Sequence, residues 1–178
     1  MAIDGGEIGW FSPDPRALIP LDERFHVPHG LKRTLKKGSF EVRVDTAFTD
    51  VMLGCAGRKE TWISSVIRDS YVNLHRLGMA HSVETWMENR LVGGLYGVAV
   101  GGAFFGESMF HKVTDASKVA LYELVQRLRE RNFTLLDTQW ITPHLAKFGA
   151  YEIPRRVYLE RLKAAIERKC TFADLVAS

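Results

Sequence analysis

Residues 90–110 read RLVGGLYGVAVGGAFFGESMF, and this stretch decides the fold class of the chain. Two apolar runs flank the pair Gly101-Gly102, which predicts two long strands joined by a tight turn. The preceding segment AHSVETWM, residues 80–87, predicts a third antiparallel strand. Three glycines mark positions where another stretch of backbone or a ligand comes close: Gly93, Gly94 and Gly97.

The segments outside this meander predict helices on both faces of a sheet. Apolar residues at helical spacing predict helices at residues 29–37, 45–57, 62–77, 117–131 and 143–148. Asp45 or Thr46 is expected to cap the second of these helices. Alternation predicts a strand at 39–45, and the apolar run 133–139 predicts a central strand. Residues 153–169 predict a final helix, or a strand followed by a helix. The expected fold class is α+β, a mixed sheet flanked by helices.

The segment from residue 10 to residue 28 differs from the rest of the chain. It contains four prolines, at positions 13, 15, 20 and 28. Proline removes a backbone donor and restricts the residue before it. We therefore predict an irregular segment that wraps around the body of the protein.

Composition limits the possible classes of protein. The chain has 178 residues, a net charge of +3 and 46% hydrophobic residues, as in an ordinary globular protein. No apolar run approaches the ~20 residues of a membrane span, and the first residues do not form a signal peptide. Two cysteines, Cys55 and Cys170, suit a reducing compartment. The six histidines have no metal-binding spacing. We expect a cytoplasmic protein with no metal and no membrane contact.

The order of elements is also that of acyl-CoA N-acetyltransferase domains (GNAT-type). Those domains need a Q/R-x-x-G-x-G/A turn to open the helix after the long hairpin, because its backbone donors hold pyrophosphate. The corresponding junction here is GESMFHKVTDASKVAL, which has no such turn. The fold is therefore expected to be acetyltransferase-like, without a coenzyme A site and with no other cofactor.

Several unusual strings resemble the bacterial leucyl/phenylalanyl-tRNA–protein transferase family. They are WFSPDPRA, TWI, VGGLYGVAVGGAFFGESMFH, ASKVAL, LLDTQ and FGAYEIPRRVYL, and the resemblance runs from about residue 10 to residue 162. It implies an acetyltransferase-like catalytic domain. It also implies transfer of Leu or Phe from aminoacyl-tRNA to proteins that begin with Arg or Lys, which marks them for degradation.

One feature departs from the family pattern. Family members usually carry an upstream stretch that ends in a GIFPW-like string and lines the groove for the aminoacyl-adenosine. This sequence begins just past that point, as a natural short form or a shortened product. We therefore expect residues 1–38 to be a wrapping segment and basic helix, the remnant of an N-terminal lobe. Residues 39–178 are expected to be the catalytic domain.

Three polar residues are the candidates for the chemistry. Asp137 and Gln139 stand two apart on a strand, so they are expected to share a face. Asp137 alone could instead cap the helix that begins at 143. The resemblance implies that this pair draws the proton from the attacking amine. Since an amide is a poor base, we interpret Gln139 as a positioning group; the residues leave open whether Asp137 takes the proton. Glu107 in GESMF is a surface residue in the simplest interpretation, and the resemblance implies contact with an α-amino group.

The resemblance also implies the residues that bind the donor. The side-chain pocket for Leu or Phe would consist of Leu95, Phe104, Met109 and Leu121, which could equally be core residues. A methionine in the pocket would allow it to accept different apolar side chains. Trp62 and Tyr71 would border the adenosine, or belong to the core.

A basic helix is the candidate tRNA-binding surface. In HGLKRTLKKG, four cations lie on the face opposite the leucines: Lys32, Arg33, Lys36 and Lys37. Such a face is usually only solvated, but the resemblance implies contact with the tRNA acceptor stem. Arg155 and Arg156 could instead hold the chain's own carboxylates.

These observations predict an aminoacyltransferase. Its donors would be Leu- and Phe-tRNA, with Met-tRNA as a further candidate, and its acceptors would be proteins with N-terminal Arg or Lys. The alternatives are an acetyl-CoA-dependent N-acetyltransferase and an inactive tRNA- or degron-binding module.

Overall fold

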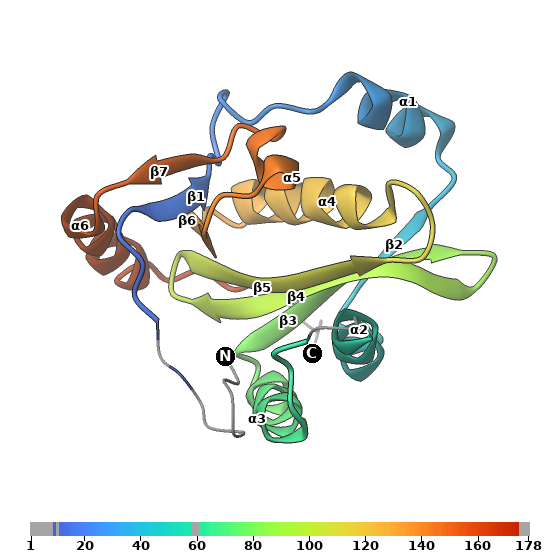
Figure 1. Cartoon of the computed structure of the whole chain (residues 1–178), viewed down its shortest axis with the longest axis horizontal. Coiled ribbons are helices and arrows are strands. Elements are labelled where there is room, and N and C mark those ends of the chain that lie inside the picture. The colour runs from blue at the N-terminus through green and yellow to red at the C-terminus, as the bar shows by residue number, and fades with distance from the viewer. Residues whose placement is uncertain (1–8, 10, 58–60, 175–178) are drawn as a thin grey trace.

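The computed structural model describes residues 9, 11–57 and 61–174. Its centre is a seven-stranded sheet with the strand order β2-β3-β4-β5-β6-β1-β7 (Figure 1). The strands are β1 (Arg16–Ile19), β2 (Glu41–Val44), β3 (Ala80–Met87), β4 (Arg90–Val100), β5 (Ala103–His111), β6 (Leu135–Gln139) and β7 (Tyr151–Ile153). The helices are α1 (His29–Lys37), α2 (Phe48–Ala56), α3 (Ser65–Arg76), α4 (Ala116–Glu130), α5 (Pro143–Ala146) and α6 (Arg155–Ile166).

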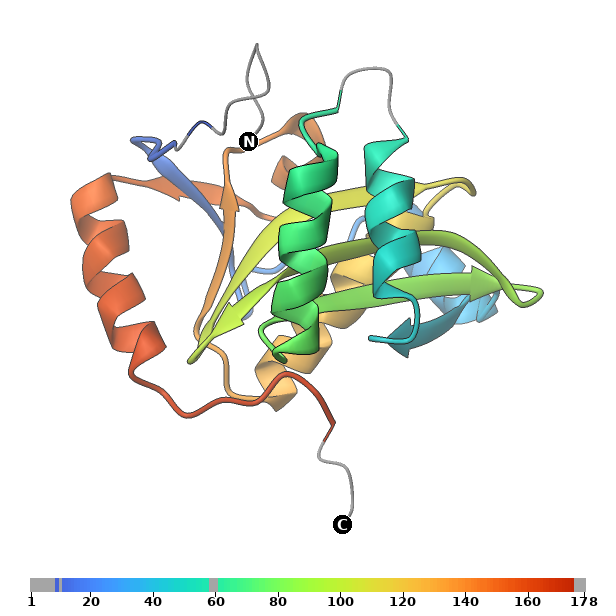
Figure 2. The same ribbon diagram turned by 90° about the horizontal axis from the view of Figure 1, so that it is seen from below.

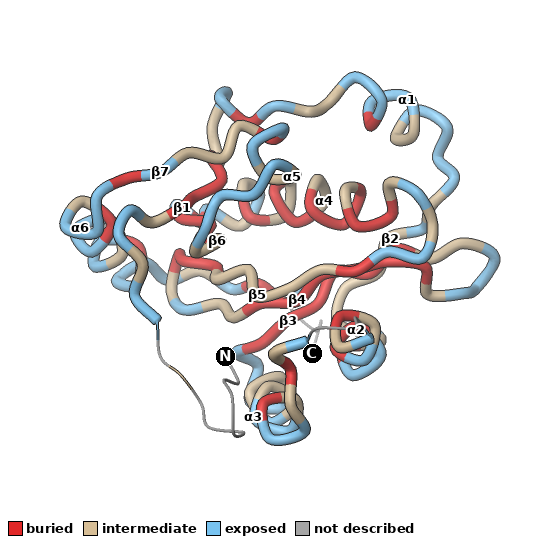
Figure 3. Tube along the Cα trace, viewed as in Figure 1, coloured by how far each residue is buried: buried red, intermediate tan, exposed pale blue. Residues whose placement is uncertain are grey.

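The predicted meander forms the middle of this sheet. Strands β3, β4 and β5 are antiparallel neighbours, and β6 pairs with β5 in parallel after the α4 crossover. Helices α2, α3 and α6 cover one face and α4 covers the other, as the view from below shows (Figure 2). Buried residues concentrate on the central strands and on the inner side of α4 (Figure 3). The α+β class with an acetyltransferase-like mixed sheet flanked by helices is confirmed.

Two of the predicted close approaches have a clear structural reason. A Cβ atom at Gly93 would lie 2.5 Å from the Cβ of Ala116, at the start of α4. A Cβ atom at Gly97 would lie 2.2 Å from the carbonyl oxygen of Phe105. Any side chain at these positions would therefore push α4 off the sheet or separate β4 from β5.

The prediction of an irregular segment at residues 10–28 is wrong for residues 16–19. These residues form β1, which pairs with β6 on one side and β7 on the other. The prolines at 15 and 20 flank the strand and do not interrupt it, so Ala17, Leu18 and Ile19 keep their backbone donors. The prediction remains accurate around it, because the rest of residues 11–28 is irregular.

The predicted cap of the helix at 45–57 is also wrong. The helix begins at Phe48, and the carboxylate of Glu84 on β3 accepts hydrogen bonds from the backbone N–H groups of Thr46 (3.0 Å) and Ala47 (3.1 Å). Asp45 instead accepts from the backbone N–H of Ser82 at 2.8 Å. Glu84 therefore holds the two residues that precede Phe48, and no side chain among the described residues caps the first turn of α2.

The last part of the chain matches the second of its two predictions, a strand followed by a helix. Strand β7 leads into α6 through Pro154. Within the described ranges, no helix has the length and apolar character needed to cross a membrane.

Candidate active site

A cavity of about 820 Å³ opens where β5 and β6 separate. The two strands pair over only three positions, Ala103–Phe105 against Leu135–Asp137. Beyond this point Gly106 and Glu107 line one side of the cavity, and Thr138 and Gln139 line the other. The site therefore lies at the divergence of two parallel strands, where backbone from both sides faces the same space.

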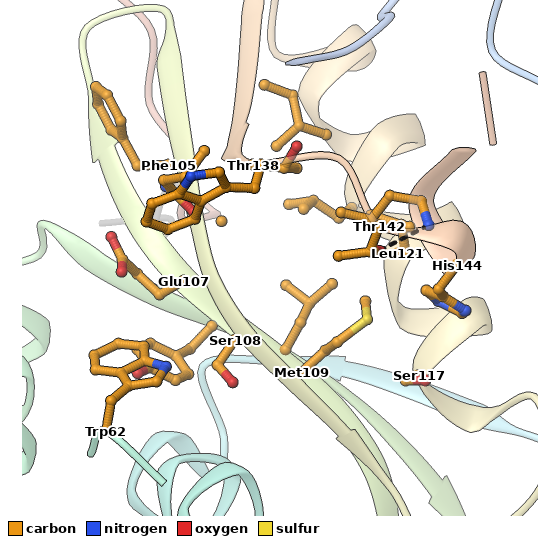
Figure 4. Close-up of a pocket in the computed structure, with 18 of the residues that line it drawn as sticks. Trp62, Phe105, Glu107, Ser108, Met109, Ser117, Leu121, Thr138, Thr142 and His144 are labelled. Carbon is orange, nitrogen blue, oxygen red and sulfur yellow. Dashed lines mark hydrogen bonds between the residues drawn. The ribbon is translucent and has the colours of Figure 1, made fainter. Parts of the chain in front are cut away.

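A β-bulge directs Glu107 into this cavity. In the β4–β5 ladder Gly97 pairs with Gly106 and Tyr96 pairs with Ser108, so Glu107 has no partner residue on β4. Bulges locally re-aim side chains and are common next to active sites. The surface interpretation of Glu107 is wrong, because its side chain is partly buried and lines the cavity (Figure 4).

The environment of Glu107 favours its neutral form. Burial raises the pKa of its carboxyl, the Tyr71 hydroxyl partly offsets that effect by hydrogen bonding, and the charge of Asp137 raises the pKa further. Tyr71 itself is largely buried, and its hydroxyl pKa is raised by burial and by Glu107. A cation that enters the cavity would favour the ionised carboxylate.

Asp137 is fully buried and surrounded by donors. Its carboxylate accepts two hydrogen bonds from Arg16 Nε (3.0 and 3.1 Å) and one from Arg16 Nη2 at 2.8 Å. The Tyr158 hydroxyl donates to it at 2.5 Å, and the backbone N–H of Gln139 donates at 2.8 Å. Asp137 does not cap the helix at 143. The cap is Thr142, whose hydroxyl oxygen accepts a hydrogen bond from the backbone N–H of Leu145 at 3.2 Å.

The Asp137 carboxylate in turn perturbs its two side-chain partners. Burial alone would lower the pKa of the Arg16 guanidinium, but the hydrogen bonds and charge of Asp137 raise it overall. Burial and Asp137 both raise the pKa of the Tyr158 hydroxyl. Both groups therefore keep their protons at neutral pH, and the negative charge of Asp137 is held between permanent donors.

Gln139 lines the cavity, whereas Asp137 lies behind its wall. The predicted strand alternation does not extend to Gln139, since this residue has a φ of 62° in the left-handed region. In the amide orientation that satisfies its surroundings, Nε2 donates to the carbonyl oxygens of Gly106 (3.0 Å) and Thr138 (3.1 Å). Both amide hydrogens are then used, so any hydrogen bond between this side chain and a ligand would be accepted by the amide oxygen.

The apolar part of the cavity contains three of the four predicted pocket residues. Leu95, Met109 and Leu121 line it, together with Leu124 and Leu136. Phe104 is fully buried and does not line the cavity; its ring packs behind the wall, 5.1 Å from the ring of Phe172. Trp62 lies on the same side of the cavity as Glu107, away from Leu121 (Figure 4). Tyr71 also lines the cavity, and its hydroxyl is the hydrogen-bond partner of Glu107.

Several cavity residues were not predicted from the sequence. They are Phe11, Arg16, Ser117, Trp140 and His144. The Nε2 atom of His144 is buried without a hydrogen-bond partner among the described residues, and burial lowers the pKa of this imidazole. Arg16 and Tyr158 belong to the strings SPDPRA and IPRRVYL, so those strings were a usable signal for the Asp137 network.

The basic helix lies apart from the cavity. All four cations of α1 are exposed, and none of them lines the cavity. The helix is attached to the body by buried Leu31 and by a hydrogen bond of 2.8 Å from Thr34 Oγ1 to Asp115. The alternative that Arg155 and Arg156 hold the chain's own carboxylates is confirmed for the Arg156 side chain, which donates to Glu160 at 2.7 Å. The Arg155 side chain instead donates to the backbone carbonyl oxygen of Ser12 at 3.1 Å.

Among solved structures, the fold is similar to the C-terminal domain (DUF2156) of a putative lysylphosphatidylglycerol synthetase from Agrobacterium fabrum. The TM-score is 0.52 with 12% identity, over 85% of this chain and 64% of that one. The mixed sheet, with a cavity between its diverging strands, places the chain in the class of acetyltransferase-like α+β folds.

Sequence comparison identifies the family within this class. A profile described as "Leucyl/phenylalanyl-tRNA protein transferase" matches residues 18–163. The leucyl/phenylalanyl-tRNA–protein transferase of Akkermansia muciniphila is 60% identical over 167 residues, 92% of this chain and 86% of the relative. That of Herpetosiphon aurantiacus is 57% identical over 169 residues, 95% and 88% of the two chains. The chain belongs to the leucyl/phenylalanyl-tRNA–protein transferase family and is an aminoacyltransferase.

The raised pKa of Glu107 predicts a cost in stability. A carboxyl whose pKa is higher in the folded state than in the unfolded state makes folding less favourable as pH rises between the two values. Glu107→Gln should therefore raise the free energy of unfolding at pH 7, by about 1.4 kcal/mol for every tenfold difference between the two acid dissociation constants. The gain should disappear at pH values below the pKa of Glu107 in the unfolded state, where its carboxyl is protonated in both the folded and the unfolded state.

Urea denaturation at pH 7 and at about pH 4, near the unfolded pKa of a glutamate, measures this effect. The matched control is Glu152→Gln, the same change at an exposed carboxyl. A variant no more stable than wild type at pH 7 would contradict the assigned environment of Glu107.

Proposed function

We propose that the cavity binds the aminoacylated 3′ end of leucyl- or phenylalanyl-tRNA, or of methionyl-tRNA, and transfers the amino acid to proteins with N-terminal Arg or Lys. The observation that carries this proposal is the combination of an apolar pocket with one available amide oxygen at the divergence of β5 and β6. An apolar side chain bound among Leu95, Met109 and Leu121 would bring its ester carbonyl toward Gln139. Family membership supports the same donor.

In the proposed reaction, the acceptor α-amine attacks the ester carbonyl carbon. The new C–N bond forms as the carbonyl electron pair moves to oxygen. When the carbonyl re-forms, the bond to the ribose 3′-oxygen breaks, and the proton lost by the amine ends on that oxygen. The ester is already activated, so most of the catalysis would come from orienting the two reactants. Gln139 would accept a hydrogen bond from the amine.

Asp137 acts in this proposal as a positioning residue. Its oxygens already accept from Arg16, Tyr158 and Gln139, so proton transfer to it would cost these charge-assisted bonds. Through the Gln139 N–H it would hold the turn that presents the amide to the cavity. Glu107 would contact the α-amino group of the donor or acceptor, and Trp62 and Tyr71 would border the adenosine.

The exposed cations of α1 would bind the phosphates of the acceptor stem. Such contacts carry no sequence information, so they would serve Leu-tRNA and Phe-tRNA alike. The modified proteins would enter N-end rule degradation in the cytoplasm, as the family resemblance implies. An N-acetyltransferase is not favoured by the comparisons, and the junction before α4 lacks the pyrophosphate turn.

The first test concerns the amide oxygen of Gln139. Gln139→Ala should slow single-turnover transfer from Leu-tRNA to an Arg-initiated peptide by about 10²–10³, as when a positioned polar group is lost (about 2.7–4 kcal/mol). The dissociation constant for tRNA should stay unchanged, because the residue is remote from α1. A variant with the full wild-type rate would exclude the proposed role.

The second test concerns the basic helix. Each phosphate contact contributes a slope of roughly −0.9 in log K against log salt, so four contacts imply about a hundredfold loss of tRNA affinity between 50 and 200 mM. Replacing Lys32, Arg33, Lys36 and Lys37 by Ala should flatten the slope by about 3 to 4 units. Transfer from an aminoacyl-adenosine, which has no stem, should survive the change.

A charge-matched pair of variants is the control for this titration. Lys36→Ala with Lys37→Ala should remove about half of the effect, whereas Lys163→Ala with Lys169→Ala removes two exposed cations elsewhere and should leave the slope unchanged. Parallel lines for wild type and the fourfold variant would mean that α1 is only a solvated helix.

A further inference from the structure

Two exposed aromatic side chains at the cavity have no role in the mechanism described so far. Phe11 is 54% exposed and Trp140 is 44% exposed, and both line the cavity. Their rings meet edge to face, with centroids 6.5 Å apart. Exposed apolar groups that gather at a cavity are typical of binding surfaces.

Both residues are held in place by the backbone around them. Trp140 follows the left-handed Gln139, and its N–H donates to Thr138 O at 2.7 Å, in a tight turn. The segment after Phe11 is tied to α6, since Arg155 donates to Ser12 O at 3.1 Å and its N–H donates to Asp14 at 2.9 Å. The aromatic pair is therefore presented by anchored backbone.

The charges around the pair suit an organic cation. Of the described residues that line the cavity, Arg16 and Glu107 are the two with a strongly basic or acidic side chain, apart from the histidines. Arg16 is neutralised by its ion pair with Asp137 at 2.8 Å, which leaves the Glu107 carboxyl to balance a bound cation. Aromatic faces attract guanidinium and ammonium groups through the ring quadrupole.

The position of Trp140 suggests which cation would bind. Adjacent Cα atoms are about 3.8 Å apart, so Trp140 stands one residue from the amide that would hold the attacking amine. The side chain of the acceptor's N-terminal residue is attached to the carbon that carries this amine, so it must lie close to Trp140. The apolar half of the cavity, with Leu95, Met109 and Leu121, is taken by the side chain of the donor in the proposed function.

We propose that Trp140 and Phe11 form the acceptor-selective surface, on which the guanidinium of an N-terminal Arg or the ammonium of an N-terminal Lys stacks. This inference rests on the proposed function, because it assigns residues to the acceptor side of the same cavity. The selectivity for a cation would then come from aromatic faces together with the charge of Glu107.

The experiment compares acceptor peptides that differ only in their first residue: Arg, Lys, citrulline or norleucine. Citrulline keeps the planar shape of Arg without its charge, and norleucine keeps the length of Lys without its charge. The kcat/KM for each peptide is measured with a saturating aminoacyl-adenosine donor, and the KM for that donor is measured with a saturating Arg peptide. Both are compared for wild type, Trp140→Phe, Trp140→Leu and Phe11→Leu. Leu159→Ala is the control, because Leu159 is also 54% exposed but lies on α6 outside the cavity.

Trp140→Leu should lower kcat/KM for the Arg and Lys peptides by about tenfold, mostly through the acceptor KM. The citrulline and norleucine peptides should change less than about twofold, and Trp140→Phe should keep most of the wild-type preference. Phe11→Leu should show a smaller loss of the same kind, and Leu159→Ala should show none.

Four results would overturn the inference. An equal loss for charged and neutral peptides would mean that Trp140 only shapes the cavity. A higher KM for the aminoacyl-adenosine with an unchanged acceptor KM would assign the aromatic pair to the donor. If wild type transfers the amino acid to these peptides and Trp140→Leu has the same kcat/KM values, the proposed function stands but the acceptor-selective surface is refuted. Absence of any transfer by wild type would instead refute the proposed function, and this inference with it.

Discussion

The buried carboxylate of Asp137 is the interaction on which the rest of the site depends. It joins β6, which carries it, to Arg16 on β1, to Tyr158 on α6 and to the backbone of Gln139. A charge with no exposure is tolerated only when donors surround it, and removal of one partner from such a pair typically costs about 3–5 kcal/mol. These contacts also hold β1 in the sheet between β6 and β7, so the wall of the cavity and the outer strands are stabilised by the same group.

The second constraint is the mismatch between β5 and its neighbours. Parallel pairing with β6 stops after three positions, and the bulge at Glu107 turns β5 away from a regular ladder with β4. Gly97 permits that bulge, because a side chain there would meet the Phe105 carbonyl oxygen. The cavity is thus produced by backbone geometry, and β5 contributes both the apolar side chain of Met109 and the carboxyl of Glu107 to its lining. One strand supplies both kinds of chemistry.

The sequence predicted the parts of the fold that depend on local patterns. The meander with its Gly101-Gly102 turn and the crossover helix α4 form as expected. Each depends on a sequence pattern within about 10 to 20 residues. Strand β1 was missed because four residues between prolines carry too little pattern. The Arg16–Asp137 pair was also beyond local analysis, since 121 positions separate the two residues. Likewise, the position of Gln139 depends on a left-handed turn that alternation cannot predict, and Phe104 lies behind the wall because the register of β5 and β4 places it there.

In the proposed mechanism, Asp137 orients the site and does not take a proton from the amine. The most direct measurement is the pH dependence of single-turnover transfer by Asp137→Asn, with Leu-tRNA and an Arg-initiated peptide. Asparagine keeps one carbonyl oxygen, which can still accept from the Gln139 N–H, and the Tyr158 hydroxyl can reverse to accept from the new amide NH2. We therefore expect a loss of about tenfold, or about 1.4 kcal/mol, with the shape of the pH profile unchanged. A fall to the uncatalysed rate, with loss of the pH dependence seen in wild type, would contradict it and identify Asp137 as the general base.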